Sequence, residues 1–198
     1  MTRKSLQSRK QQVVRDAIYD AAIELFVSKG FEETTIDDVA EAVGISQRSF
    51  FRYFASKDDL LAVSVLKVGS VLAETVAACP ANYTTLQVVR ETVLSALNYS
   101  ASRPRIHQVV ELAMRSTRAR QAYMSRMMEV EDKLADVLAA RMSAPSGVSL
   151  KPRMLAGVTL SIMNASVSSW FLGEFKDLNT AGKRALTDFT RAVAEKEV

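Results

Sequence analysis

Residues 31–61, FEETTIDDVAEAVGISQRSFFRYFASKDDLL, contain two short runs with the apolar spacing of helices, over residues 36–43 and 47–54. Only a few residues separate the runs, so the two helices must pack closely and the chain must reverse sharply. Ala40 supplies a small side chain where the helices would cross, and Gly44 tolerates the positive φ that the reversal requires. The stretch therefore predicts a helix-turn-helix.

Helix-start signals and an apolar interior support this prediction. Thr35, with Asp38 three positions later, has the pattern of a capping box at the start of the first helix. Ser46 is placed to cap the second helix, and Ser56 repeats the pattern for the next one. The side chains expected to fill the small core are Val39, Val43, Ile45, Phe50 and Phe54. Caps, turn and core thus agree on one local structure.

The face of the second helix that lies outside this core suits DNA. Its side chains are Gln47, Arg48, Ser49, Arg52 and Tyr53. Arg is the commonest reader of guanine and Gln of adenine, whereas Ser and Tyr hydroxyls bind phosphates. Backbone N–H groups at the helix starts near Thr35 and Ser46 favour a further phosphate. A helical hairpin with a solvated charged face is the structural alternative, but here the caps, the turn glycine and the basic face occur together.

The distribution of charge is more informative than its sum. The chain has a net charge of +4, yet residues 1–60 hold nine Lys and Arg against ten Asp and Glu. The basic residues are segregated, because five precede Asp16 and three more fall between Arg48 and Lys57. Residues 1–13 are poor in apolar side chains and lead into no signal-peptide core. We expect them to form a disordered arm that becomes ordered on DNA, in a minor groove.

The run over residues 31–61 resembles the signature of the tetracycline-repressor (TetR/AcrR) family, and the match extends over about residues 14–62. The resemblance implies a homodimer that binds a palindromic operator and releases it when a ligand enters the C-terminal domain. Asp37 departs from some members, which carry a basic reader at this position, so we leave it out of the site.

The resemblance also implies roles for single residues. It implies base or thymine-methyl contacts from Gln47, Arg48, Ser49 and Phe51, and phosphate contacts from Thr35, Tyr53 and Lys57. Phe51 fits a core position and a groove position equally well. With Ser46 and Arg52 from the helix face, the candidate DNA-binding set is Thr35, Ser46, Gln47, Arg48, Ser49, Phe51, Arg52, Tyr53 and Lys57.

Helical spacing continues from Val14 to the C-terminus without strand-like alternation, so we predict an all-α fold of about nine helices. The first helix should end at Gly30 in a left-handed conformation, with Phe31 folding back on Phe26. Further helices are expected near residues 57–78, 86–102, 104–114, 119–142, 150–173 and 180–197, between breaks rich in Gly, Pro and Ser. We divide the chain into an arm and three-helix DNA-binding domain, residues 1–56, and a helical ligand-binding and dimerisation domain, residues 57–198.

The uncharged helix expected over residues 150–173 carries a small residue at every fourth position. These residues are Gly157, Ser161, Ala165 and Ser169. Such a ridge allows close packing against a symmetry mate, so we expect it to form the dimer interface, together with the last helix, in a four-helix bundle. Residues 154–173 are also about long enough to span a membrane, but their six Ser, Thr and Asn side chains disfavour that reading.

The C-terminal domain offers flexible apolar side chains and a few polar anchors that suit a hydrophobic effector pocket. The candidates are His107, Met114, Tyr123, Met127, Met163, Asn164, Trp170 and Phe171. Methionine at helical spacing is more often ordinary core. The single Cys and single His, and the lack of any catalytic or phosphate-binding motif, predict no enzyme activity, no cofactor and no metal site.

These features favour a cytoplasmic, ligand-responsive repressor that a small apolar molecule releases from double-stranded DNA. The alternative is a constitutive or architectural DNA-binding protein without small-molecule input. A helical enzyme or carrier with a merely structural hairpin is disfavoured by the missing chemistry.

Overall fold

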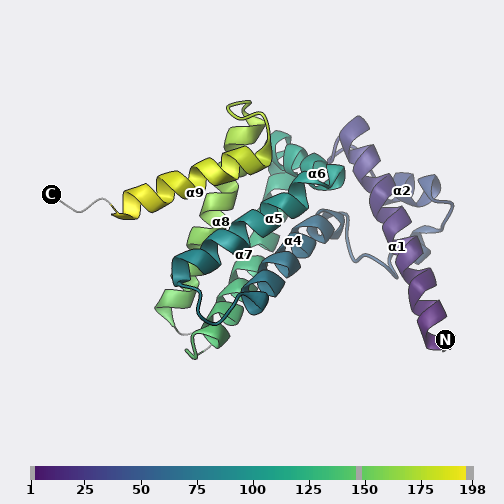
Figure 1. The fold of residues 1–198 in the computed structure, drawn as a ribbon. Coiled ribbons are helices and arrows are strands. Elements are labelled where there is room, and N and C mark those ends of the chain that lie inside the picture. The colour runs from purple at the N-terminus through teal and green to yellow at the C-terminus, as the bar shows by residue number, and fades with distance from the viewer. Residues whose placement is uncertain (1–2, 146–148, 195–198) are drawn as a thin grey trace. The chain divides into compact units, whose positions relative to one another are not determined.

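The computed structural model describes residues 3–145 and 149–194, and over these residues the chain consists of helices without a strand (Figure 1). The predicted all-α fold is therefore confirmed for the described residues. The helices are α1 (Arg3–Ser28), α2 (Ile36–Ala42), α3 (Gln47–Phe50), α4 (Asp58–Ala78), α5 (Thr85–Ala101), α6 (Pro104–Arg115), α7 (Thr117–Arg141), α8 (Leu150–Phe171) and α9 (Leu178–Ala194).

The helices form two compact units. The first contains residues up to Val65 together with Arg105–Arg126, and the second contains Leu66–Pro104 and the residues from Met127 onward. The first unit thus holds the helix-turn-helix, with most of α6 and the first turns of α7 added to it. The predicted division after residue 56 stays a prediction, because compactness does not show which segment folds or binds DNA by itself.

α1 begins much earlier than predicted. It starts at Arg3, so the expectation of a disordered arm is wrong for residues 3–13, while residues 1 and 2 lie outside the described residues. The physical reason is that Lys, Arg and Gln are good helix formers. Extending a helix that is already nucleated adds one hydrogen bond for each residue fixed, so this polar segment can follow the apolar part of α1.

The first unit is built around a single apolar core. α1 contributes Ile18 and Phe26, which are fully buried. Gly30 ends the helix with φ +105°, and the Phe31 ring then lies 4.9 Å from that of Phe26, as predicted. The other buried side chains include Val39, Phe50, Phe54, Leu60, Leu61, Val109, Leu112 and Ala119. Side chains of α6 and α7 therefore complete the core beneath the helix-turn-helix.

Ion pairs add to this packing within the first unit. Arg105 of α6 binds Asp20 at 3.0 Å and Glu24 at 2.6 Å, both on α1. Arg126 of α7 binds Asp59 at 2.8 Å, in the first turn of α4. Exposed pairs of this kind contribute about 0–1 kcal/mol each, so the apolar core supplies most of the stability.

The second unit depends on two close helix crossings. A Cβ atom on Gly69 of α4 would lie 2.7 Å from Cγ2 of Val130 on α7. A Cβ atom on Gly182 of α9 would lie 2.1 Å from Cδ1 of Leu97 on α5. A side chain at either glycine would displace Val130 or Leu97, so each glycine allows close approach of the paired helices. α8 also packs against α5 and α9.

Two helices, α4 and α8, are long and apolar enough to cross a membrane by length and composition, with mean hydropathies of 1.8 and 1.2 over their most apolar windows. Core helices of soluble proteins share this property. In α8 the buried Thr159 and Ser166 hydroxyls donate to the carbonyl oxygens of Leu155 and Ile162, one turn earlier. These helices are weak support for a membrane span.

Candidate nucleic-acid interface

The start of α2 has the predicted capping box. The Asp38 backbone N–H donates to Thr35 Oγ1 at 3.1 Å, and the Thr35 backbone N–H donates to Asp38 Oδ2 at 2.7 Å. Lys29 also binds Asp38 Oδ2 at 2.6 Å. The Lys29 hydrogen bond, followed by that from the Thr35 backbone, lowers the pKa of Asp38 to about 2. The acidic cap is therefore held in its charged form, and the position of Thr35 is fixed.

The turn between α2 and α3 follows the predicted geometry. Gly44 has φ +67°, and the Ile45 N–H donates to the carbonyl oxygen of Ala40 at 2.9 Å. Ala40, the predicted small residue, is buried. A glycine is needed at residue 44 because a side chain would be strained at this φ.

α3 is shorter than predicted. The Ser49 N–H donates to the Ser46 hydroxyl at 3.2 Å, which confirms the N-terminal cap, but the helix covers only Gln47–Phe50 instead of residues 47–54. After Phe50 the backbone forms a tighter turn, in which the Tyr53 N–H donates to the Phe50 carbonyl oxygen three residues earlier. This turn keeps Phe54 buried beside Phe50, with ring centroids 5.9 Å apart.

The candidate DNA-binding side chains differ in their exposure to solvent. Those exposed to solvent are Thr35, Ser46, Gln47, Arg48, Phe51 and Arg52, whereas Ser49, Tyr53 and Lys57 are half-buried. Phe51 is 49% exposed while its neighbour Phe50 is fully buried. Of the two alternatives left by the sequence, the exposed position of Phe51 fits a groove contact better than a core position.

Lys57 lies differently from a simple phosphate contact. Its ammonium group donates to the carbonyl oxygens of Phe31, Glu32 and Thr34 at 2.5, 3.2 and 2.9 Å. Burial lowers the pKa of Lys57. Because an ammonium group has only three N–H donors, these carbonyls engage all of them. Lys57 thus holds the loop that leads to Thr35.

Arg15 is a residue of this region that the sequence analysis missed. Its Nη1 donates to the carbonyl oxygen of Tyr53 at 2.9 Å, and its guanidinium lies 4.4 Å from the centroid of the Phe54 ring. Arg15 therefore fixes the end of the α3 turn against α1. The available signal was spacing, since Arg15, although exposed itself, precedes the buried Ile18 and Ala22 at helical intervals.

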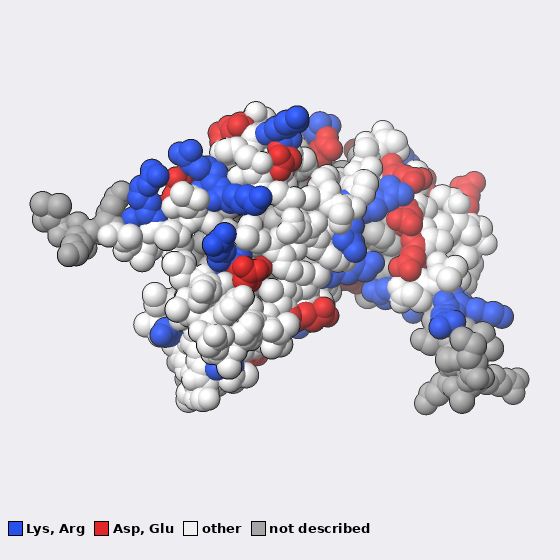
Figure 2. All heavy atoms as spheres, viewed as in Figure 1, with Lys and Arg blue, Asp and Glu red and all other residues white. Residues whose placement is uncertain are grey.

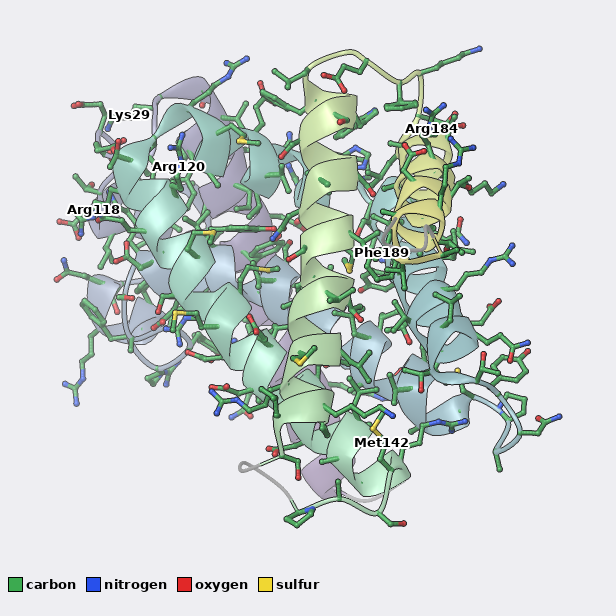
Figure 3. All side chains as sticks on the ribbon, turned by 90° about the vertical axis from the view of Figure 1, so that its left-hand side faces the viewer. Lys29, Arg118, Arg120, Met142, Arg184 and Phe189 are labelled. Atoms are coloured by element: carbon green, nitrogen blue, oxygen red, sulfur yellow. The ribbon has the colours of Figure 1, made fainter. Side chains whose placement is uncertain are left out.

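The predicted dimerisation ridge lies along a groove in the second unit. Ser161, Ala165 and Ser169 of α8 line a hollow of about 630 Å³ whose other side is α9. The α9 side includes Ala185 and Phe189, and Figure 3 shows Phe189 on the side of α9 that faces α8. A groove with small residues on one side and an aromatic ring on the other is suited to receive another helix.

Gly157, the fourth predicted ridge residue, does not line this groove. A Cβ atom on Gly157 would lie 3.2 Å from Oε1 of Glu131 on α7. Four residues turn a helix through more than one full revolution, so a four-residue ridge drifts around the helix and its ends face different neighbours.

The predicted effector residues are divided between the two units. His107, Met114 and Tyr123 belong to the first unit, and the other five belong to the second. Met127 and Met163 are buried, whereas Asn164 and Phe171 are exposed. Burial raises the pKa of Tyr123 to about 12, so its phenol stays neutral. The assignment of these residues to an effector pocket stays a prediction.

Two family models match the chain. Residues 18–63 match the model described as bacterial regulatory proteins, tetR family, and residues 83–194 match the model described as MftR C-terminal domain. The second match alone covers more than half of the chain, and the first contains the whole helix-turn-helix.

Similar proteins include the HTH-type transcriptional regulator TcmR of Streptomyces glaucescens, which is 28% identical over 185 residues, covering 87% of this chain and 80% of TcmR. Among solved structures, NalD, the secondary repressor of the MexAB-OprM multidrug efflux pump in Pseudomonas aeruginosa, has a TM-score of 0.65 at 18% identity, covering 93% of this chain and 96% of NalD. Thermus thermophilus FadR, a TetR-family transcriptional repressor in complex with lauroyl-CoA, has a TM-score of 0.58 at 23% identity, covering 93% and 97%. At these identities the two structures show a common fold. The chain belongs to the TetR family of bacterial transcriptional regulators.

Proposed function

We propose that this regulator is a repressor that binds a palindromic operator as a homodimer and leaves it when a small molecule binds. The observation that carries the proposal is the exposed surface of α3 and the turn after it, where Gln47, Arg48 and Arg52 are exposed close to the capped helix start at Ser46. Gln and Arg side chains read bases in the major groove, and backbone N–H groups at helix starts hold phosphates.

The groove between α8 and α9 supports the homodimer. Its small side chains allow a second copy of α8 or α9 to approach closely, and an interface about a two-fold axis uses the same surface on both chains. A dimer in which two α3 helices enter successive major grooves requires half-sites about 34 Å apart, or a multiple of that distance.

Support for the effector comes from composition and from one relative. The second unit contributes the buried Met127 and Met163 and the half-buried Trp170, which suit an apolar ligand. FadR of T. thermophilus was solved in complex with lauroyl-CoA, and both FadR and NalD are described as repressors. We extend ligand response and repression to this chain on that basis, with a cytoplasmic location and no enzymatic role.

Selection of bound duplexes from a random DNA pool tests this function. The proposal expects inverted repeats with a fixed spacing that corresponds to one turn of DNA or a multiple of it. Recovery of only asymmetric sites without fixed spacing would contradict the homodimer. A metabolite library or cell extract added to the selected duplex should include a component that weakens binding, whereas unchanged affinity throughout would favour a constitutive regulator.

A further inference from the structure

The first unit has a polar hollow next to the turn after α3. The proposed contacts with bases do not involve all of the residues that line it. It has a volume of about 360 Å³ and is lined by Gln11, Gln12 and Arg15 of α1 together with Arg52 and Tyr53 of the turn after α3. Two of these five side chains are guanidinium groups and none is a carboxylate. The hollow therefore presents N–H and O–H donors without an acidic group in its lining.

Hydrogen bonds keep the hollow in place and leave donors available. Arg15 uses Nη1 to bind the Tyr53 carbonyl oxygen, so other guanidinium N–H groups remain for a ligand. Gln12 donates to Asp16 Oδ1 at 2.8 Å. Asp16 is the acidic residue that lies closest in the sequence to the residues lining the hollow. Gln11 and Arg52 are exposed, and the Arg52 guanidinium lies 5.8 Å from the centroid of the Tyr53 ring.

α1 extends this positive region along the helix. Because α1 is helical from Arg3, the exposed Arg9 and Lys10 lie within two turns of the hollow along the helix. Figure 2 shows a group of Lys and Arg side chains near the N-terminal end of α1. The acidic residues of α1, Asp16, Asp20 and Glu24, follow in the C-terminal part of the helix.

We propose that this hollow binds a backbone phosphate of the operator that lies outside the bases read by α3, which makes α1 a second DNA-contacting element. A phosphodiester is favoured because guanidinium groups bind its oxygens in pairs and amide N–H groups complete the contact. This inference rests on the proposed DNA-binding function. In this proposal the N-terminal segment contacts the DNA backbone as part of helix α1, in place of the disordered arm expected in a minor groove.

Charge changes at Gln11 test the proposal, since this side chain is exposed and can be altered without loss of core packing. Gln11→Glu should weaken binding of the selected duplex about tenfold by repelling the phosphate, and Gln11→Lys should strengthen it. Gln121→Glu and Gln121→Lys, at an exposed position on α7 of the same unit, are matched controls and should bind like the wild type.

Neutral methylphosphonates, introduced one position at a time, identify the phosphate involved. In the wild type, one substitution outside the recognised bases should weaken binding, and on that duplex Gln11→Glu should bind as well as the wild type. If no phosphate outside those bases affects the wild type, or Gln11→Glu matches Gln121→Glu, the inference is wrong although the operator is palindromic. Failure to recover a palindrome contradicts the proposed dimer instead.

Two further measurements separate the remaining outcomes. On a random duplex, Gln11→Lys should steepen and Gln11→Glu should flatten the salt dependence of binding by about one unit in the log–log slope, so the hollow is tested even without an operator. Inorganic phosphate, titrated without DNA, represents a free anion. If it raises the Tm of the wild type but not of Gln11→Glu, while the methylphosphonate series shows no effect, the hollow is a free-anion site and the DNA contact is ruled out.

Discussion

At the residue scale, two basic side chains of the DNA-binding unit point their charge at backbone carbonyl oxygens. Lys57 binds three carbonyls of the loop before α2, and Arg15 binds the carbonyl at the end of the α3 turn. Both side chains therefore stabilise the backbone on either side of the α2–α3 pair. An effect of either residue on DNA binding can therefore pass through the geometry of α2 and α3, without a direct contact.

We predict that Lys57→Met lowers both the stability of the protein and its affinity for DNA. Methionine keeps the length of the side chain but leaves three carbonyl groups without their donor, which should cost about 1–3 kcal/mol of unfolding free energy. Urea denaturation and DNA titration measure the two effects. Lys133→Met, at an exposed position of α7, is the control. A loss of affinity with unchanged stability would instead identify Lys57 as a plain phosphate contact.

Arg48 should behave as a base reader, because its side chain is exposed on α3. We predict that Arg48→Ala loses about 1–3 kcal/mol of binding free energy and relaxes the preference at one base pair in each half-site. Competition between duplexes that differ at single positions measures this. Arg153→Ala, an exposed arginine on α8, should leave the preference unchanged. Equal losses on all sequences would make Arg48 a phosphate contact.

At the element scale, the stability of α2 depends on its N-terminal cap, since a helix of 7 residues is too short to be stable by itself. Thr35 and Asp38 satisfy two of its first N–H groups, and Lys29 supports the Asp38 carboxylate from α1's C-terminal side. The cap therefore ties the start of α2 to the segment that follows α1.

The capping box predicts a specific acid sensitivity. The pKa of Asp38 in the folded chain, about 2, lies below its value in the unfolded chain. Its contribution to stability is then fully present above about pH 5 and is lost as the pH falls towards 2. The difference in urea midpoint between the wild type and Asp38→Asn should narrow over this range. Asp37→Asn, at the exposed neighbouring position, should show a smaller dependence; equal dependence in both variants would rule out this role for the cap.

Most elements could be predicted from the sequence because their ends carry local signals. Thr35, Ser46, Gly30 and Gly44 act through hydrogen bonds and φ angles within a few residues, and all four do so in the structure. The start of α1 is not evident from composition, because low apolar content favours disorder while the same Lys, Arg and Gln residues are good helix formers. The early end of α3 has no local signal of this kind, and the turn after it is contacted by Arg15, 38 residues away from Tyr53 in the sequence.

The candidate site could be predicted only where a local pattern places the residue. Exposure of Gln47, Arg48 and Arg52 follows from the helical pattern, whereas the position of Lys57 depends on a loop that no local pattern places. The candidate effector residues could be selected only by their residue type, because no motif or spacing marks them. Methionine and tryptophan fill cores as readily as pockets, so the sequence could not select among them.

At the scale of the whole molecule, DNA recognition by the proposed homodimer requires two chains, because one α3 offers too few base contacts. The groove between α8 and α9 is the surface through which a second copy would be joined. Affinity for the operator should therefore depend on residues of the second unit that do not contact DNA.

We predict that Ala165→Leu impairs dimerisation, because it places a bulky side chain in the groove that Ala165 lines. Operator affinity should fall together with the fraction of dimer. Sedimentation velocity measures the oligomeric state, and Ala140→Leu, at an exposed position of α7, is the matched control. An Ala165→Leu variant that stays dimeric and binds normally would place the interface elsewhere.

Binding as a homodimer is tested most directly by a stoichiometric titration of the wild-type chain against the selected operator and against a duplex that contains only one half-site. Fluorescence anisotropy combined with sedimentation gives both the affinity and the number of chains bound. Two chains should bind the full operator, and binding to the half-site should be weaker by about 100-fold or more, because the second half-site is engaged within the same complex. One chain per operator, with the same affinity for both duplexes, would show that the chain does not bind as a homodimer.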